Sequence, residues 1–135
     1  MLKPIKKEDH KFLFELLKQR RPLANISHKR MPIWEEHVKF VKSKPYSKWY
    51  VIIHEEKKIG SIYLSKQNEI GIHLCKKNES DSLYINAIKE LMRVNSKRIF
   101  LANTSPKNKK YIKYFQELGL KMIHHTYELD LRKNT

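Results

Sequence analysis

Three short strand-like segments follow one another in the middle of the chain, and they restrict the fold more than any other feature of the sequence. The segments WYVIIHE, IGSIYL and EIGIHLC are rich in β-branched and aromatic residues, and the polar segments EEKK and SKQN separate them. Connections this short join antiparallel neighbours. We therefore predict a meander of three antiparallel strands over residues 49–75.

Segments with helical periodicity precede and follow the meander. KEDHKFLFELLKQR and PIWEEHVKF come before it, and SLYINAIKELMRV and KKYIKYFQEL, closed by Gly119, come after it. Further strands are expected at residues 3–5 and in KRIFLA at residues 97–102, and KMIHHTYELDL at residues 121–131 is expected to form the last strand or strand pair. The predicted order is β-α-α-β-β-β-α-β-α-β, an α/β (α+β) fold with a mixed sheet.

The length of 135 residues is enough for one domain, so we expect residues 1–135 to form one. No apolar run is long enough to cross a membrane, and the first residues contain no signal-peptide core, so the cytoplasm is the expected location. Cys75 is the only cysteine, which excludes an internal disulfide and a cysteine-based zinc site. The histidines show no metal-ligand spacing, so no metal is expected.

The chain is strongly basic, with a net charge of +15, and only six of its 29 basic residues are arginine. The lysines are scattered, whereas nucleic-acid surfaces concentrate charge and favour arginine. The densest basic stretch is SPKNKKYIKYF. A solvated lysine-rich surface and a surface for a polyanion or an anionic cofactor both remain open from charge alone.

The stretch CKKNESDSLYINAIKELM is expected to be a loop that leads into a helix. A helix start after a strand attracts anions and is a common phosphate site. This loop, however, contains no glycine, and it carries the acids Glu79 and Asp81. Its candidate N-caps are Asn78, Ser80, Asp81 and Ser82. The acids can weaken a phosphate site, or they can simply complement the dipole of a well-capped helix.

This order of elements, with these residues at its joints, resembles the GNAT superfamily of acetyl-CoA-dependent N-acetyltransferases over essentially the whole chain. The resemblance is closest to the small members that acetylate amino sugars and ribosomal proteins. LANTSPKNKKYIKYFQELGL is similar to the family pattern Asn-x-x-Ser-x-x-x-[Tyr/Phe]-x-x-x-Gly-Phe, with Asn108, Phe115 and Gly119 in place. Tyr111 stands for the serine and Leu120 for the phenylalanine.

The resemblance implies acetyl-CoA as acyl donor. In the family the pantetheine arm pairs with the fourth strand, which places it here along Ile72, His73 and Leu74. The pyrophosphate rests on a helix start with the pattern [Gln/Arg]-x-x-Gly-x-[Gly/Ala], and Glu79, Ser82 and Tyr84 fall on its three fixed positions without matching them. Tyr84 can fill the phosphate space or turn onto the apolar face of the helix. The full set of expected cofactor contacts is Ile72, His73, Leu74, Glu79, Ser80, Asp81, Ser82, Leu83, Tyr84 and Asn108.

The resemblance also implies roles in catalysis. Glu69, at the start of the fourth strand, is the candidate base, and a surface acid is its alternative; His73 is a weaker candidate. The usual tyrosine acid is replaced by Phe115, so Tyr111 and Tyr114 are the candidates to protonate the thiolate. Asn103 is expected to face the acceptor. The remaining expected acceptor contacts are Arg20, Arg21, Ser27, His28 and His37.

These features lead to three hypotheses about function. The first is an N-acetyltransferase that modifies a primary amine of a small molecule, with a nucleotide-linked amino sugar as one acceptor. The second is a catalytically degenerate binding module that keeps the GNAT fold and binds CoA weakly or not at all. The third, the least favoured, is a nucleic-acid-binding domain. No membrane partner is expected, and a homodimer is left open.

Overall fold

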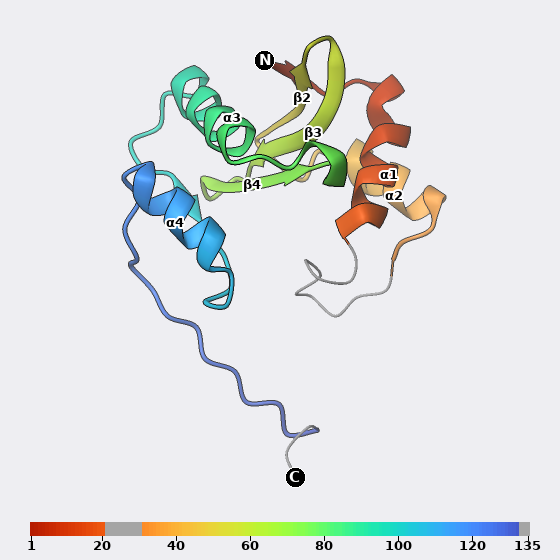
Figure 1. Cartoon of the computed structure of the whole chain (residues 1–135). Coiled ribbons are helices and arrows are strands. Elements are labelled where there is room, and N and C mark those ends of the chain that lie inside the picture. Colours follow the sequence, from red (N-terminus) through yellow and green to blue (C-terminus); the bar gives the residue numbers. More distant parts are fainter. Residues whose placement is uncertain (21–30, 133–135) are drawn as a thin grey trace.

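The computed structural model describes residues 1–20 and 31–132, in which five strands form one sheet in the order β1-β2-β3-β4-β5 (Figure 1). Neighbouring strands from β1 to β4 are antiparallel, and β5 is parallel to β4. The strands are β1 Leu2–Pro4, β2 Lys48–His54, β3 Lys57–Leu64, β4 Glu69–Leu74 and β5 Leu101–Ala102. The predicted mixed, mainly antiparallel sheet and its central meander are therefore confirmed.

Tight turns hold the meander in register. Glu55 and Glu56 connect β2 to β3 with φ values of 50° and 66°, and two positive φ values are typical of a type I′ hairpin turn. In the next turn the Ser65 hydroxyl accepts a hydrogen bond of 2.9 Å from the Glu69 N–H, and Asn68 has a φ of 66°. This second turn fixes the backbone at the point where β4 begins.

Helices pack on both sides of the sheet (Figure 1). The pair α1 and α2 lies at one side, and the pair α3 and α4 lies at the other. Residues of the second pair share a hydrophobic core with β3 and β4, in which Ile62, Leu64 and Leu91 are completely buried. The helices are α1 His10–Arg20, α2 Trp34–Lys42, α3 Asp81–Val94 and α4 Lys109–Glu117, with the short 3-10 turns η1 Lys7–Asp9 and η2 Lys76–Asn78.

An aromatic ring crosses the backbone of β4 at a glycine. The Tyr63 ring stacks on the Tyr46 ring, with 3.7 Å between their centroids, and it lies where a Cβ at Gly71 would be. Any side chain at residue 71 would collide with that ring, so glycine is required by close packing and not by an unusual φ.

The last predicted strand is not formed, and this corrects the predicted element order. Residues 121–131 belong to no strand, and they run away from the body of the molecule after α4 (Figure 1). The fifth strand is also shorter than predicted, because only Leu101 and Ala102 of residues 97–102 pair. Both differences have one physical reason. A strand is stabilised by hydrogen bonds to a neighbour, and within the described chain no strand lies on the outer edge of β5.

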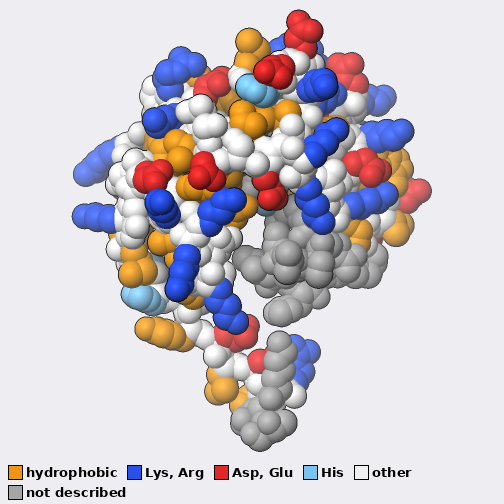
Figure 2. Space-filling model, viewed as in Figure 1, with side chains coloured by type: hydrophobic (Ala, Val, Ile, Leu, Met, Phe, Trp, Pro, Cys, Tyr) orange, Lys and Arg blue, Asp and Glu red, His pale blue; other side chains and the backbone are white. Residues whose placement is uncertain are grey.

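On the face drawn in Figure 2, positive charge is spread out and is not gathered in one patch. Figure 2 shows Lys and Arg side chains over the whole visible face, with Asp and Glu side chains between them. Among the helices of residues 1–20 and 31–132, none is long and apolar enough to cross a membrane. The described part of the chain also contains no group of three His, Cys, Asp or Glu side chains that could hold a metal ion.

Candidate functional site

The strands β4 and β5 separate after a short parallel contact. They pair at Glu69–Leu101 and at Ile70–Ala102, and β4 then continues to Leu74 without a neighbouring strand on that side within the described residues. We call the backbone of residues 71–74, which has no strand beside it on that side in the described part of the chain, the β4 edge. An open edge of this kind can accept an extended ligand through backbone hydrogen bonds.

Two predicted site residues meet at the narrow end of this gap. The Asn103 side-chain amide donates a hydrogen bond of 2.5 Å to the Glu69 carboxylate. Glu69 begins β4 and is partly buried, and Asn103 directly follows β5. The carboxylate is consequently held in place at the point where the two strands part.

The start of α3 lies at the wide end of the gap. Ser80 is the N-cap, because its hydroxyl accepts a hydrogen bond of 3.1 Å from the Leu83 N–H. The Ser82 hydroxyl lies 3.3 Å from the Ser80 hydroxyl. Of the four cap candidates in the sequence, the structure therefore uses Ser80, with Asp81 in the first turn, where its charge complements the helix dipole.

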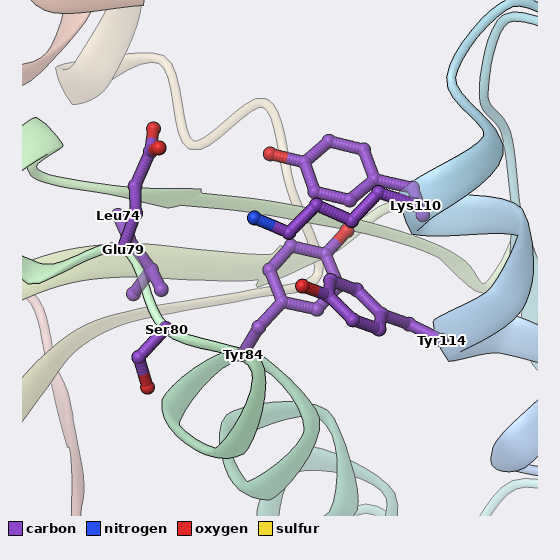
Figure 3. A pocket seen from close by; sticks show the side chains of 7 residues that line it. Leu74, Glu79, Ser80, Tyr84, Lys110 and Tyr114 are labelled. Carbon is purple, nitrogen blue, oxygen red and sulfur yellow. The ribbon is translucent and has the colours of Figure 1, made fainter.

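Tyr84 turns onto the apolar face of α3, where its side chain is buried. Its ring stacks on Tyr111 of α4, with 4.7 Å between centroids and 12° between planes, and it also contacts Tyr114 at 5.0 Å (Figure 3). The Tyr114 hydroxyl donates a hydrogen bond to the Asp81 carboxylate. We call Tyr84, Tyr111 and Tyr114 the tyrosine cluster, and it ties α3 to α4.

A small pocket remains beside the tyrosine cluster (Figure 3). Its volume is about 20 Å³, which is room for one water molecule and far below the size of a ligand pocket. The Lys110 side chain extends from α4 into the space between Glu79 and the rings, and its ammonium lies 3.9 Å from the Asp81 carboxylate. The lining residues are Leu74, Glu79, Ser80, Tyr84, Lys110, Tyr111 and Tyr114.

The tyrosine cluster stays protonated at neutral pH. Burial raises the pKa of Tyr84, and the two neighbouring tyrosines raise it further. Burial also raises the pKa of Tyr114, followed by its hydrogen bond to Asp81 and by the charge of that carboxylate. For Tyr111 burial is again the larger cause, and the charge of Glu79 adds to it. All three hydroxyls thus keep their protons, and that of Tyr114 is already donated.

Solved structures with a similar fold include known acetyltransferases, although neither a protein-family model nor a curated protein matches the sequence. An N-acetyltransferase from Staphylococcus aureus Mu50 superposes with a TM-score of 0.73 at 14% identity, over 88% of this chain and 81% of that one. Mutant forms of the spermidine/spermine N-acetyltransferase SpeG from Vibrio cholerae give 0.72 at 12% identity, over 96% and 86%. A domain from Methanocaldococcus jannaschii gives 0.72 at 22% identity, over 95% and 92%.

The chain has the GNAT acetyltransferase fold. At these levels of identity the comparison establishes the fold alone, and it confirms the fold that the sequence resemblance predicted.

Within this GNAT fold, Asn108 is the N-cap of α4. Its side-chain oxygen accepts a hydrogen bond of 3.3 Å from the Tyr111 N–H, so the asparagine orients the helix that carries two residues of the tyrosine cluster. Its cofactor contact stays a prediction. Ile72, Leu74 and Leu83 have partly buried side chains that pack against the core, and their contacts with a cofactor also stay a prediction.

The structure does not bring the predicted acceptor residues together in the way that it brings Glu69 and Asn103 together. His37 is buried between α1 and α2, where its ring lies 5.2 Å from the Phe14 ring, and burial lowers its pKa. It therefore supports the contact between these two GNAT-fold helices and is not on an open surface. Arg20 ends α1, whereas Arg21, Ser27 and His28 lie outside the described residues.

Two contacts of the site could not be named from the sequence. The Tyr114–Asp81 hydrogen bond joins residues 33 positions apart, and Lys110 approaches the same carboxylate. The available signal was the interleaving of aromatic and basic residues in KKYIKYF, whose helical spacing puts Tyr111 and Tyr114 on one face.

Proposed function

We propose that this protein is an acetyl-CoA-dependent N-acetyltransferase that modifies a primary amine of a small molecule. The observation that carries the proposal is the Glu69–Asn103 contact at the point where β4 and β5 separate. It places a carboxylate that can accept a proton at the end of a backbone edge that can hold an extended ligand.

The described residues fit the extended arm of the acyl donor better than they fit its phosphates. The β4 edge along Ile72, His73 and Leu74 suits an extended arm, which would bind as an added strand. At the helix start, Tyr84 occupies the position of a glycine, and the remaining space is about 20 Å³. Phosphates would therefore be held by lysine side chains such as Lys110 and by the free N–H groups of α3. When bound, the donor supplies an activated acetyl thioester.

The side chains supply the proton transfers that amide formation requires. Glu69 accepts the proton of the acceptor ammonium, and Asn103 keeps the carboxylate oriented through its 2.5 Å hydrogen bond. Tyr111 is the preferred proton donor to the departing sulfur, because the hydroxyl of Tyr114 is engaged by Asp81. Burial keeps the pKa of Tyr111 above its ordinary value, so this proton is present at neutral pH.

The charge of the protein favours one acceptor class over another. A net charge of +15 repels a polycation such as spermidine, the substrate in the name of one structural neighbour, and attracts an anionic acceptor. A nucleotide-linked amino sugar carries both an amine and a diphosphate, so we propose it as the acceptor. Arg20, Arg21 and Ser27 remain the proposed contacts for it, since His37 is enclosed by helices.

A second function, a GNAT-fold binding module without catalysis, is favoured by the tyrosine cluster. The rings of Tyr84 and Tyr111 stack between α3 and α4 beside the start of α3, and the space left at that end of the gap is about 20 Å³, too small for the phosphates of the donor. If these rings do not move, the fold serves only as a scaffold for binding or assembly.

Titration with acetyl-CoA separates the two functions. We expect saturable heat in calorimetry and a rise of the melting temperature that grows with the logarithm of ligand concentration. Thiol release is then measured with an amino-sugar nucleotide and with spermidine, and the sugar nucleotide is expected to react faster. Absence of both heat and stabilisation at millimolar acetyl-CoA would end the enzymatic proposal and favour the non-catalytic module.

A further inference from the structure

The segment after α4 has the pattern of a strand but lies in solvent. We call residues 121–131 the C-terminal arm. Its odd-numbered positions from 123 onward are mostly apolar, and its even-numbered positions from 124 onward are polar, so an extended arm has one apolar face. The exposed fractions of the large apolar side chains are Met122 74%, Ile123 71%, Tyr127 88%, Leu129 77% and Leu131 74%.

The arm is already extended. The rings of His125 and Tyr127 stack with 8° between their planes and 6.2 Å between centroids, which is the arrangement of two side chains on the same face of a strand. In the described chain, no backbone hydrogen bond joins residues 121–131 to the rest of the molecule. Single exposed apolar residues are common in proteins, but a continuous apolar face of this length indicates a binding surface.

The sheet has one edge that fits this arm. At β1 the outer edge is closed, because the Leu2 N–H is bonded to the Glu90 carboxylate at 2.9 Å and Pro4 has no N–H. At β5 the outer edge has no strand beside it within residues 1–20 and 31–132, and Ile99 next to it is 54% exposed. The arm and the β5 edge each lack the partner that the other would provide.

The end of α4 directs the arm away from its own sheet. Gly119 has a φ of 91°, and the Leu120 N–H donates to the Phe115 carbonyl at 2.9 Å, so the helix ends in a left-handed glycine cap. The chain that leaves this cap runs outward and does not return to β5 (Figure 1). An extended arm of this length reaches about 36 Å, which is enough to cross to another molecule.

We propose that two copies of this chain exchange their C-terminal arms, each arm adding a strand to the β5 edge of the partner. A second copy is the occupant that the structure favours, because every copy carries both an arm and an open edge and a two-fold arrangement fills both. The exchange would lengthen β5 and support Asn103, which directly follows it. The inference rests on the arm and the edge, so it does not depend on the proposed catalysis.

Light scattering after gel filtration of the full chain tests the exchange. We expect a dimer at micromolar concentration. The double variant Tyr127→Asp, Leu129→Asp, which charges the apolar face, should be a monomer. The matched control His124→Asp, Thr126→Asp adds the same two charges to the polar face and should remain a dimer. A monomeric unmodified chain, or a dimer that persists in the Tyr127→Asp, Leu129→Asp variant, would overturn the proposal.

Cross-linking of the unmodified chain tests the exchange without relying on a variant. Chains labelled with ¹⁴N and with ¹⁵N are mixed, unfolded, refolded together, and treated with a carbodiimide, which joins carboxylates to nearby amines. Links from Glu128 or Asp130 of the arm to Lys97 beside β5 should join peptides of different label as often as peptides of the same label. Links found only within one label would show that the arm pairs with its own sheet.

Discussion

The two ends of the gap between β4 and β5 are built in different ways. At the narrow end, a turn and a strand fix Glu69, and Asn103 holds its carboxylate at 2.5 Å. At the wide end, Tyr84 stands at a position where the family pattern has glycine, and its ring stacks on Tyr111 between α3 and α4. A backbone edge does not depend on the identity of its side chains, whereas a phosphate cradle of the family kind needs positions without side chains, and here both glycine positions carry one.

Replacing Glu69 tests the narrow end and should have the largest effect. The Glu69→Gln variant keeps the shape and can still bond to Asn103 but cannot accept a proton, so the rate of acetyl transfer should fall by about 10²- to 10⁴-fold. Thiol release at saturating acetyl-CoA measures this. The matched control Glu79→Gln changes a carboxylate at the other end and should keep most of the activity. Equal rates for Glu69→Gln and the unmodified chain would remove Glu69 as the base.

Opening the wide end should have an intermediate effect. The triple variant Glu79→Gln, Ser82→Gly, Tyr84→Gly restores the family pattern, removes one negative charge, and removes the ring that packs between α3 and α4 beside the helix start. We expect acetyl-CoA to bind about tenfold tighter, or about 1.4 kcal/mol, in calorimetry.

The double variant Glu79→Gln, Ser82→Gly retains the ring and serves as the control for the triple variant. Circular dichroism establishes that each variant is folded. If both variants bind acetyl-CoA no better than the unmodified chain does, the ring is not what limits binding and the donor lies elsewhere on the surface.

Alkaline pH should lower the free energy of unfolding through the tyrosine cluster at the wide end. This is the smallest of the three expected effects. The folded protein holds the pKa values of Tyr84 and Tyr114 above the ordinary value of 10, mainly through burial. Above pH 10 the unfolded chain loses protons that the folded chain keeps, so the free energy of unfolding falls as the pH rises. Each such tyrosine contributes up to about 1.4 kcal/mol per pH unit.

Urea unfolding between pH 9 and 11 measures this slope. The Tyr84→Phe and Tyr114→Phe variants should each show a shallower slope, whereas Tyr127→Phe in the exposed arm should not change it. Identical slopes in all three variants would mean that the cluster ionises in the folded state as freely as it does in the unfolded one.

Local patterns were enough to predict most of the fold. The alternation in WYVIIHE, IGSIYL and EIGIHLC gave the meander, and the spacing of Leu83, Tyr84, Ala87 and Leu91 gave α3 to within one residue of its observed start. These elements depend on residues close in sequence, so the sequence contains the information directly.

Features that depend on distant partners were harder to predict. The alternation at residues 121–131 is real, but a strand also needs a neighbour, and in the described chain none is present. For Tyr84 both the phosphate space and the apolar face were open, and its stacking on Tyr111, 27 positions away, decides for the apolar face. Glu69 and Asn103 were each predicted at the site, yet their contact depends on how β4 and β5 pair.

The turn between β2 and β3 is a site where substitution should stabilise the protein. Glu55 and Glu56 adopt left-handed backbone angles that asparagine and glycine tolerate better, so replacing them should raise the free energy of unfolding. With an Asn-Gly pair at these two positions, the more stable protein would stay folded when destabilising substitutions are made elsewhere. Variants that remove the buried ring of Tyr84 are best made in such a reinforced background, where they can be studied as folded proteins.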